Sequence, residues 1–263
     1  MLVAEIQRAE SGRYAACLVL LPGLWAGPAA WRGPAGYLAH RGWESHLLDL
    51  RGIPGGHDSR AAAVAEYVAT LGVPPVLVAH GGGAATALAT ARRASMQGVV
   101  LVAPLVPGSR GARELTLGVR SALPLLLGRR VAPPRGYQED LLLGPVPEPA
   151  RHPIRAGLGP ESAAVVWETA RGTRAALDRT VATVIISGGR DLLLPAEEAV
   201  ALAATLAADH VVLPDAGAWP IAGPGWQGVV GAVHRWIVRR LGAPLLDLYP
   251  EAMAAREEEE EEP

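Results

Sequence analysis

The sequence contains no phenylalanine, lysine or asparagine, and it has one cysteine in 263 residues. Without phenylalanine, leucine, valine and the seven tryptophans must fill the core. All 24 basic residues are arginine, which we interpret as a coding bias towards GC-rich codons rather than as a functional signal. Because Cys17 has no second cysteine to pair with, an intrachain disulfide and a cysteine-rich metal site are both excluded.

A clustered basic patch and a long apolar run are also missing. The net charge is −2, and a run of glutamates at 257–262 dominates that figure. The other charges are dispersed, which does not favour binding to nucleic acid. No run reaches the roughly 18 to 20 apolar residues that span a membrane, and the charges at Glu5, Arg8 and Glu10 are not typical of a signal peptide. We therefore expect a cytoplasmic protein whose partners are neither nucleic acid nor membrane.

Strand-like and helix-like segments alternate along most of the chain. Apolar runs typical of buried strands occur at 15–21, 44–50, 75–79, 98–103, 182–187 and 210–214. Helices are predicted at 31–41, 60–71, 84–94, 195–208 and 227–241. Strands that alternate with helices of this length indicate βαβ units, so we predict an α/β fold with a doubly wound, mostly parallel sheet.

The alternation is interrupted in the middle of the chain. There, prolines and glycines separate short helical stretches such as 113–127 and 161–176, which indicates an insertion above the sheet. The tail ends in glutamates that repel one another, and we expect it to be disordered. The predicted units are a core at 1–105 and 178–246, a helical cap at 106–177 and the acidic tail at 247–263.

Ligands of open parallel sheets bind beyond the carboxyl ends of the strands, so the turns at those ends are candidate functional sites. The turn after 75–79 reads Ala79-His80-Gly81-Gly82-Gly83 and leads directly into an alanine-rich helix. Small residues two before and two after a nucleophile permit the tight turn of a nucleophile elbow, and Ala79 and Gly83 meet that requirement. The nucleophile position of such an elbow is Gly81, which has no side chain.

Five segments, in order, resemble motifs of the α/β-hydrolase superfamily. They are LLPGLWAGPAAW at 20–31, DLRGIPGGHDS at 49–59, LVAHGGGA at 77–84, SGGRDLLLP at 187–195 and LPDAGAWP at 213–220. The resemblance extends over about residues 15–241 and implies an α/β-hydrolase-type sheet with a helical cap. It also implies that Gly81 stands at the nucleophile position, Asp191 at the position of the triad acid and Ala218 at that of the triad histidine.

Two of these three positions depart from the family pattern. A serine hydrolase needs a nucleophilic side chain, a histidine that takes its proton and a carboxylate that orients the histidine. Gly81 and Ala218 replace the first two, and only Asp191 remains. Loss of either cooperating group typically lowers the rate by about 10⁴- to 10⁶-fold. Conventional serine hydrolysis is therefore predicted to be absent.

The glycine turn at 80–83 also fits two other motifs. The sequence HGGG at 80–83 is also the motif of a lipase oxyanion loop, which precedes the nucleophile. In that register the nucleophile would lie downstream at Ser109, the candidate with glycine neighbours. A dinucleotide-binding motif needs glycine or alanine where Thr86 stands and an acidic residue soon after, but no Asp or Glu occurs between Glu66 and Glu114. The elbow interpretation is favoured, and the Ser109 register stays open.

Further residues near these turns are candidates for binding or chemistry, although each also has a structural explanation. A solvated loop would account for His57, an ion pair with Arg190 would account for Asp191, and core packing would account for the tryptophans. The histidines lack metal-ligand spacing, so neither a metal nor a cofactor is expected. The candidates for the pocket or an oxyanion site are Leu24, Trp25, His57, His80, Gly82 and Trp219.

Three classes of function remain open from the sequence. The favoured one is a non-hydrolysing protein that binds a small apolar or acyl-type molecule, or a protein partner, in the former active-site cleft. The alternative is an enzyme with triad-independent chemistry, such as an isomerase, lyase, cyclase or unorthodox ester hydrolase, that uses Asp191 with His57 or His80. The third is an assembly role in which the insertion at 106–177 or the acidic tail docks on another protein.

Overall fold

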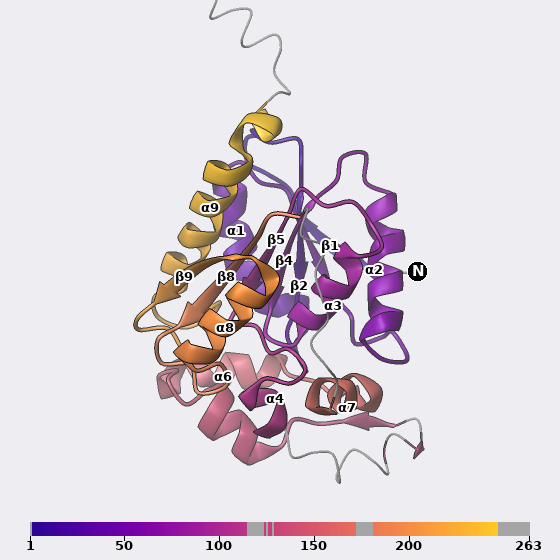
Figure 1. Ribbon diagram of the computed structural model, residues 1–263, viewed down its shortest axis with the longest axis vertical. Coiled ribbons are helices and arrows are strands. Elements are labelled where there is room, and N and C mark those ends of the chain that lie inside the picture. Colours follow the sequence, from indigo (N-terminus) through magenta and orange to yellow (C-terminus); the bar gives the residue numbers. More distant parts are fainter. Residues whose placement is uncertain (1, 115–123, 125, 128, 172–180, 247–263) are drawn as a thin grey trace, which may run out of the picture.

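The computed structural model describes residues 2–114, 124, 126–127, 129–171 and 181–246. They form a central sheet with helices on both faces and further helices at one end (Figure 1). The described strands lie in the order β1-β3-β2-β4-β5-β8-β9. They are β1 (Ala4–Gln7), β2 (Leu18–Leu21), β3 (Ser45–Leu48), β4 (Val76–His80), β5 (Gly98–Val102), β8 (Thr183–Gly188) and β9 (Asp209–Leu213).

The predicted α/β fold with a doubly wound, mostly parallel sheet is confirmed. Every neighbouring pair of strands in the central sheet is parallel except β1 with β3. After β2 the chain adds β3 on one side and β4 on the other, so the strand order reverses at β2. Such a reversal opens a crevice beyond the carboxyl ends of the strands. The turns that begin at Pro22 and Gly81 follow β2 and β4 at this point.

The central strands are buried on both faces, which explains their continuous apolar sequences. Successive side chains of a strand point to opposite faces. Accordingly, Leu18 and Leu20 belong to one core cluster, whereas Val19 and Leu21 belong to the other. Tryptophan takes the packing role that phenylalanine would share, because three tryptophans are fully buried. They are Trp25, Trp31 and Trp43.

Two layers of helices cover the sheet. On one face, α1 (Arg32–His40) packs against α9 (Trp226–Leu246), and the 3-10 helix η1 (Pro28–Trp31) precedes α1. The other face carries α2 (His57–Ala69), α3 (Gly83–Ala91) and α8 (Ala196–Leu206), whose apolar residues share one core cluster. No helix among the described residues combines the length and the apolarity that a membrane span requires.

Two elements differ from the sequence expectation. Strand β1 was not predicted, because it is a short edge strand whose residues are mostly exposed and carry no apolar pattern. The helix predicted at 60–71 begins earlier, at His57, so the expected solvated loop around His57 is wrong. Gly56 is extended and Asp58 lies in the first helical turn, where a negative charge is favourable.

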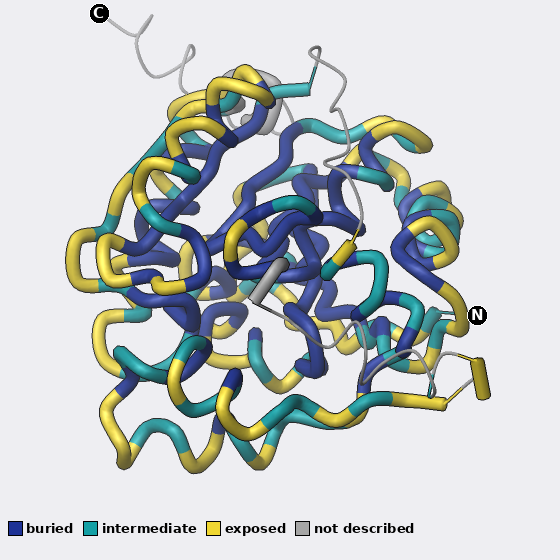
Figure 2. The backbone as a smooth tube through the Cα atoms, turned by 60° about the horizontal axis from the view of Figure 1, so that its bottom comes forward, coloured by how far each residue is buried: buried dark blue, intermediate teal, exposed yellow. Residues whose placement is uncertain are grey.

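The described part of the insertion between β5 and β8 lies beyond one end of the sheet (Figure 1). It contains a two-stranded sheet as well as helices, so it is not purely helical. Its elements are α4 (Arg110–Glu114), β6 (Arg130–Val131), the π-helix η2 (Tyr137–Leu142), α6 (Glu148–Gly157), β7 (Glu161–Ser162) and α7 (Ala163–Arg171). Figure 2 turns this end towards the viewer and shows buried backbone at the centre with more exposed segments around it. Most of the helix predicted at 113–127, the end of the one predicted at 161–176 and the tail at 247–263 lie outside the described residues.

Candidate functional site

Gly81 forms the sharp turn between β4 and α3. Its φ of +50° lies in the left-handed region that glycine adopts without strain. Its N–H donates to the carbonyl of Val102 at 3.0 Å, and its own carbonyl accepts from Ala84 at 3.1 Å and Leu105 at 2.9 Å. A Cβ built at Gly81 has Gly23 Cα at 3.6 Å as its nearest neighbour. The turn is therefore held on both sides, yet it leaves ordinary contact space for a side chain at position 81.

The glycines after Gly81 are fixed by close backbone packing. A Cβ at Gly83 would lie 2.5 Å from the carbonyl oxygen of Pro22, which cannot move aside. A Cβ at Gly82 would lie 2.5 Å from Cγ of Leu24. The turns after β2 and β4 thus touch at this point, and the small residue expected two positions after Gly81 has a steric cause. Leu24 and Gly82, the candidate oxyanion donors, lie side by side here.

Asp191 lies in the turn after β8 and is buried. Its Oδ1 accepts the N–H groups of Leu193 and Leu194 at 2.8 and 3.0 Å. Its Oδ2 is buried without a hydrogen-bond partner among the described residues. Burial raises the pKa of the Asp191 carboxyl to about 6, although the two backbone N–H groups oppose that rise. The expected ion pair with Arg190 is wrong, because Arg190 is exposed and the ion pairs among the described residues do not include it.

His80 and Ala218 are joined by a hydrogen bond. Nε2 of His80 donates to the carbonyl oxygen of Ala218 at 2.9 Å, which fixes the tautomer and leaves Nδ1 without a partner among the described residues. Burial lowers the pKa of His80 to about 4, so the ring is neutral at physiological pH. The indole of Trp219 meets this imidazole edge-on, with ring centroids 4.8 Å apart. His80 therefore fastens the turn at 218–219 to the end of β4.

The space around Gly81 is almost filled. A cavity of about 20 Å³ remains, which is roughly the volume that one water molecule needs. Leu24, Trp25 and Tyr137 are buried side chains in its wall, together with Ala218 and Trp219. An acyl chain does not fit into this volume. A ligand of the expected apolar or acyl type would therefore have to occupy a neighbouring space.

His57 is part of a buried polar contact between the core and the insertion. Its Nδ1 lies 3.0 Å from Oγ1 of Thr86 on α3, and its Nε2 lies 2.7 Å from Oγ1 of Thr169 on α7. Its backbone N–H donates to Glu168 at 2.7 Å. Burial, helped by the positive charge of Arg60, lowers the pKa of His57 to about 3. His57 is thus neutral and enclosed by internal partners, so it does not have the exposure that an acid–base group needs.

An ion pair that sequence reasoning missed lies next to His57. Arg60 on α2 and Glu161 on β7 are both buried, with side-chain exposures of 4% and 1%. The two terminal nitrogens of the Arg60 guanidinium, Nη1 and Nη2, donate to the Glu161 carboxylate. The same carboxylate accepts the N–H of Trp25 at 3.2 Å. The indole N–H of Trp25, in turn, donates to the carbonyl of Val131 at 3.0 Å. We call Arg60, Glu161, His57 and Thr169 the polar strut, because they tie α2 to the insertion.

Ser109 and Cys17 are held in internal positions. Ser109 is fully buried, and its hydroxyl donates to the carbonyl of Val106 at 2.8 Å. The N–H of Ala112 reaches its Oγ at 3.3 Å, so Ser109 closes the first turn of α4. Burial raises the pKa of the Cys17 thiol to about 11, which keeps it protonated and unreactive. Neither residue has the exposure that a nucleophile needs.

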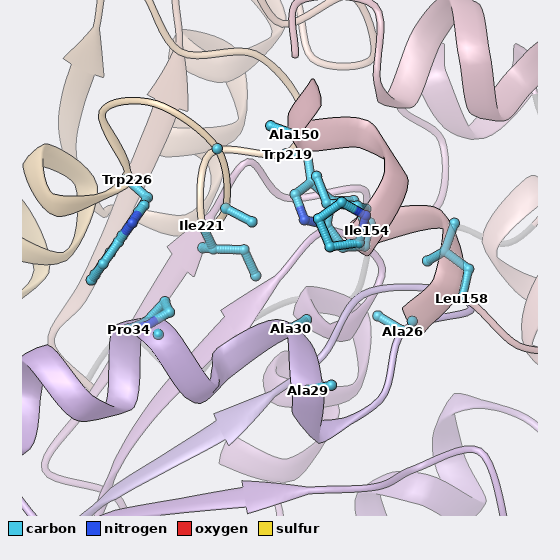
Figure 3. A pocket seen from close by; sticks show the side chains of 15 residues that line it. Ala26, Ala29, Ala30, Pro34, Ala150, Ile154, Leu158, Trp219, Ile221 and Trp226 are labelled. Carbon is cyan, nitrogen blue, oxygen red and sulfur yellow. The ribbon is translucent and has the colours of Figure 1, made fainter. Parts of the chain in front are cut away.

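A larger space opens on the other side of Trp219. This apolar pocket has a volume of about 240 Å³ and lies between η1 with the start of α1, the helix α6 and the turn at 219–226. Figure 3 shows Ile154 of α6 and Leu158, just after that helix, on one side of the pocket, with Ile221 and Trp226 on the other side. Its lining consists of alanine, glycine, proline, leucine, isoleucine and tryptophan, without a charged side chain or a hydroxyl.

The structure therefore brings some of the predicted residues together and separates others. Leu24, Trp25, His80, Gly82 and Trp219 line the cavity at Gly81 with Ala218. Among the described residues, His57 and Asp191 do not line that cavity. No group of three His, Cys, Asp or Glu side chains in the described part of the chain can hold a metal ion.

The sequence matches one family model over residues 18–248, and that model is described as the alpha/beta hydrolase family. Because the match covers most of the chain and the sheet order agrees, this protein belongs to the alpha/beta hydrolase family. None of the curated proteins compared with the chain matches it by sequence.

Solved structures support the same fold. A thermophilic esterase from Thermogutta terrifontis superposes with a TM-score of 0.64 at 22% identity, over 90% of this chain and 93% of the esterase. A monoacylglycerol lipase from Paleococcus ferrophilus gives 0.69 at 17% identity, over 91% and 99%. MenH from S. aureus also gives 0.69, at 15% identity and with the same coverage. At these identities the similarity establishes the fold and not the reaction.

Proposed function

We propose that this protein is a non-hydrolysing member of the alpha/beta hydrolase family that binds a small, uncharged apolar molecule in the apolar pocket on the other side of Trp219 from Gly81. One observation carries the proposal. A pocket of about 240 Å³, whose lining side chains carry no charge and no hydroxyl, shares Trp219 with the small cavity at Gly81, where the turn has the shape of a nucleophile elbow but carries no side chain. The ligand is therefore placed next to the former catalytic position rather than in it.

The chemistry of the residues around Gly81 supports the absence of hydrolysis. Gly81 offers no nucleophile, and Ala218 offers no base beside it. The imidazole of His80 is engaged with a carbonyl oxygen and has a pKa of about 4, so it is a poor proton acceptor at neutral pH. Ser109, the nucleophile of the other register, is enclosed and hydrogen-bonded.

The composition of the apolar pocket determines what it favours. Apolar area removed from water contributes roughly 25 cal/mol per Å², and a lining of this kind offers no compensation to a buried charge. Anions and cations are therefore disfavoured, whereas a compact hydrocarbon or a weakly polar aromatic molecule is favoured. Trp219 and Trp226 provide flat walls at which an aromatic ring packs well.

A pair of glycine variants tests the pocket. Gly33 lines it from α1, and a Cβ there has only Trp226 within 4 Å. Gly33→Leu is expected to fill the pocket and to weaken binding of N-phenyl-1-naphthylamine, an uncharged fluorescent probe, by tenfold or more. Gly36→Leu is the matched control, because Gly36 lies on the same helix outside the pocket and its Cβ meets nothing within 4 Å. Probe fluorescence and its quenching of tryptophan emission measure both affinities.

The same experiment has a clear contrary outcome. The proposal fails if the wild type does not bind the probe, or if Gly33→Leu and Gly36→Leu weaken binding equally. Both variants replace a helical glycine, which is stabilising by roughly 0.5 to 1 kcal/mol in a helix interior. A difference between them in probe affinity therefore reports the pocket and not the stability of α1.

One observation favours the triad-independent enzyme as a second candidate. Asp191 has a buried oxygen without a partner in the described part of the chain and a pKa of about 6, which suits proton transfer near neutral pH. Of its two expected helpers, however, His57 is confined by Thr86 and Thr169, and His80 is engaged with the carbonyl of Ala218 and has a pKa of about 4, so Asp191 would act alone. A conversion by the wild type that Asp191→Asn abolishes would establish this candidate. Unchanged turnover in Asp191→Asn would exclude it.

A further inference from the structure

A second pocket lies on a different side of the insertion and has the opposite chemistry. It has a volume of about 440 Å³ and is formed by the turn after β3, the strand β6 and the start of α7. Three of its lining residues are arginines, and none is acidic. They are Arg51, Arg129 and Arg130.

The arginines are placed by contacts within the pocket wall. Arg130 donates from its guanidinium to the backbone carbonyl oxygen of Arg51 at 2.9 Å, so the Arg130 side chain is held against the turn after β3. The pairing of β6 with β7 sets Arg130 opposite Ser162 in the register. The hydroxyl of Ser162 donates to the carbonyl of Gly55 at 2.7 Å and closes the wall between the core turn and the insertion.

Two carboxylates lie near this pocket, and each is paired with an arginine, so that Arg129 and Arg130 are the lining arginines outside the ion pairs of the described residues. Asp49 is occupied by Arg51 through two hydrogen bonds of 2.9 and 2.6 Å. Glu161, next to Ser162 in the sequence, is buried on Arg60. Among the ion pairs of the described residues, none includes Arg129 or Arg130.

Like charges brought together in one pocket repel each other unless an opposite charge joins them. Guanidinium groups offer forked donors that match the oxygens of phosphate and carboxylate groups. We propose that this pocket binds a small organic anion through its phosphate or carboxylate oxygens, with Arg129 and Arg130 as the principal donors. The site is separate from the apolar pocket and does not depend on the ligand proposed there.

Calorimetric titration of the full chain with inorganic pyrophosphate and with citrate, at an ionic strength held constant with sodium chloride, tests the proposal. At least one anion is expected to bind with a dissociation constant below 1 mM. Tighter binding of pyrophosphate identifies a phosphorylated ligand, and tighter binding of citrate identifies a carboxylate. Arg130→Gln is expected to weaken the tighter of the two by tenfold or more.

Arg135→Gln is the matched control for charge. Arg135 is an exposed arginine of the same insertion that does not line the pocket, so its loss changes the net charge equally. Because Arg130 also holds the carbonyl of Arg51, Arg129→Gln is a second variant that leaves that hydrogen bond in place. The proposal is overturned if neither anion binds the wild type, or if Arg129→Gln and Arg130→Gln weaken binding no more than Arg135→Gln does.

Discussion

The two sides of the turn at Gly81 are built in opposite ways. On one side the polar strut ties α2 to the insertion through the Arg60–Glu161 ion pair and the contact of His57 with Thr169. His57 also contacts the hydroxyl of Thr86 on α3. On the other side α6 lies over η1 and α1 with small apolar residues between them, and a pocket of about 240 Å³ remains. The insertion is therefore fastened by directed contacts on one side and leaves space on the other.

This difference explains how the fold keeps a defined pocket whose lining side chains carry no charge and no hydroxyl. Buried hydrogen bonds and ion pairs specify one arrangement, because an unmatched partner is costly. Small residues such as Ala29, Ala30 and Gly33 pack without filling the gap beneath α6. The strut thus holds the insertion in place. The pocket forms between small apolar residues and does not depend on a catalytic side chain.

Breaking the strut has the largest expected effect. Glu161→Ala leaves Arg60 buried without its counter-charge, which typically costs about 3 to 5 kcal/mol. Glu148→Ala is the control, because Glu148 pairs with Arg155 on the surface, where solvent and salt screen an ion pair and its contribution to stability is small. Urea unfolding measures both free energies. Equal losses in the two variants would show that the strut does not fasten the insertion.

The second effect is acid destabilisation through His57. Its folded pKa of about 3 lies below the unfolded value of 6.5, so stability is complete above pH 6.5 and is lost as the pH falls towards 3. Between pH 7 and 5, wild type is expected to lose about 2 kcal/mol more than His57→Gln. Unfolding free energies at the two pH values measure this difference, and identical pH slopes would contradict the buried, neutral state of His57.

Asp191 gives the smallest effect, with the opposite sign. Its folded pKa of about 6 lies above the ordinary value of 3.8, so ionisation costs stability as the pH rises through this interval. From pH 5 to 7, wild type is expected to lose about 1 kcal/mol more than Asp191→Asn. Paired unfolding curves at the two pH values check this, and a gain in wild type over the variant would show that the carboxylate has found a partner.

The sequence predicted the sheet well because strands buried on both faces have continuous apolar runs, as β4 and β5 do. The turn at Gly81 was predictable from its glycines, whose close approach to Pro22 and Leu24 the structure explains. The strut was not predictable, because Arg60 and Glu161 are 101 residues apart and neither belongs to a recognised motif.

The pockets were beyond sequence reasoning for a related reason. The apolar pocket combines residues from three distant segments, and its size depends on how α6 lies over α1. The burial of His57 likewise depends on Thr169 from the insertion. Local patterns report which residues face a core, but they do not report the gaps that remain after distant elements have packed.

The most direct test of the central claim is labelling with a fluorophosphonate probe. We predict that the wild type remains unlabelled and does not hydrolyse short-chain nitrophenyl esters, whereas the double variant Gly81→Ser/Ala218→His is labelled at position 81. The space beside the Cβ position of Gly81 accommodates such a side chain, although its positive φ adds strain of roughly 1 to 3 kcal/mol. Labelling of the wild type, mapped to Ser109 or to another serine, would contradict the account and identify the protein as an unorthodox hydrolase.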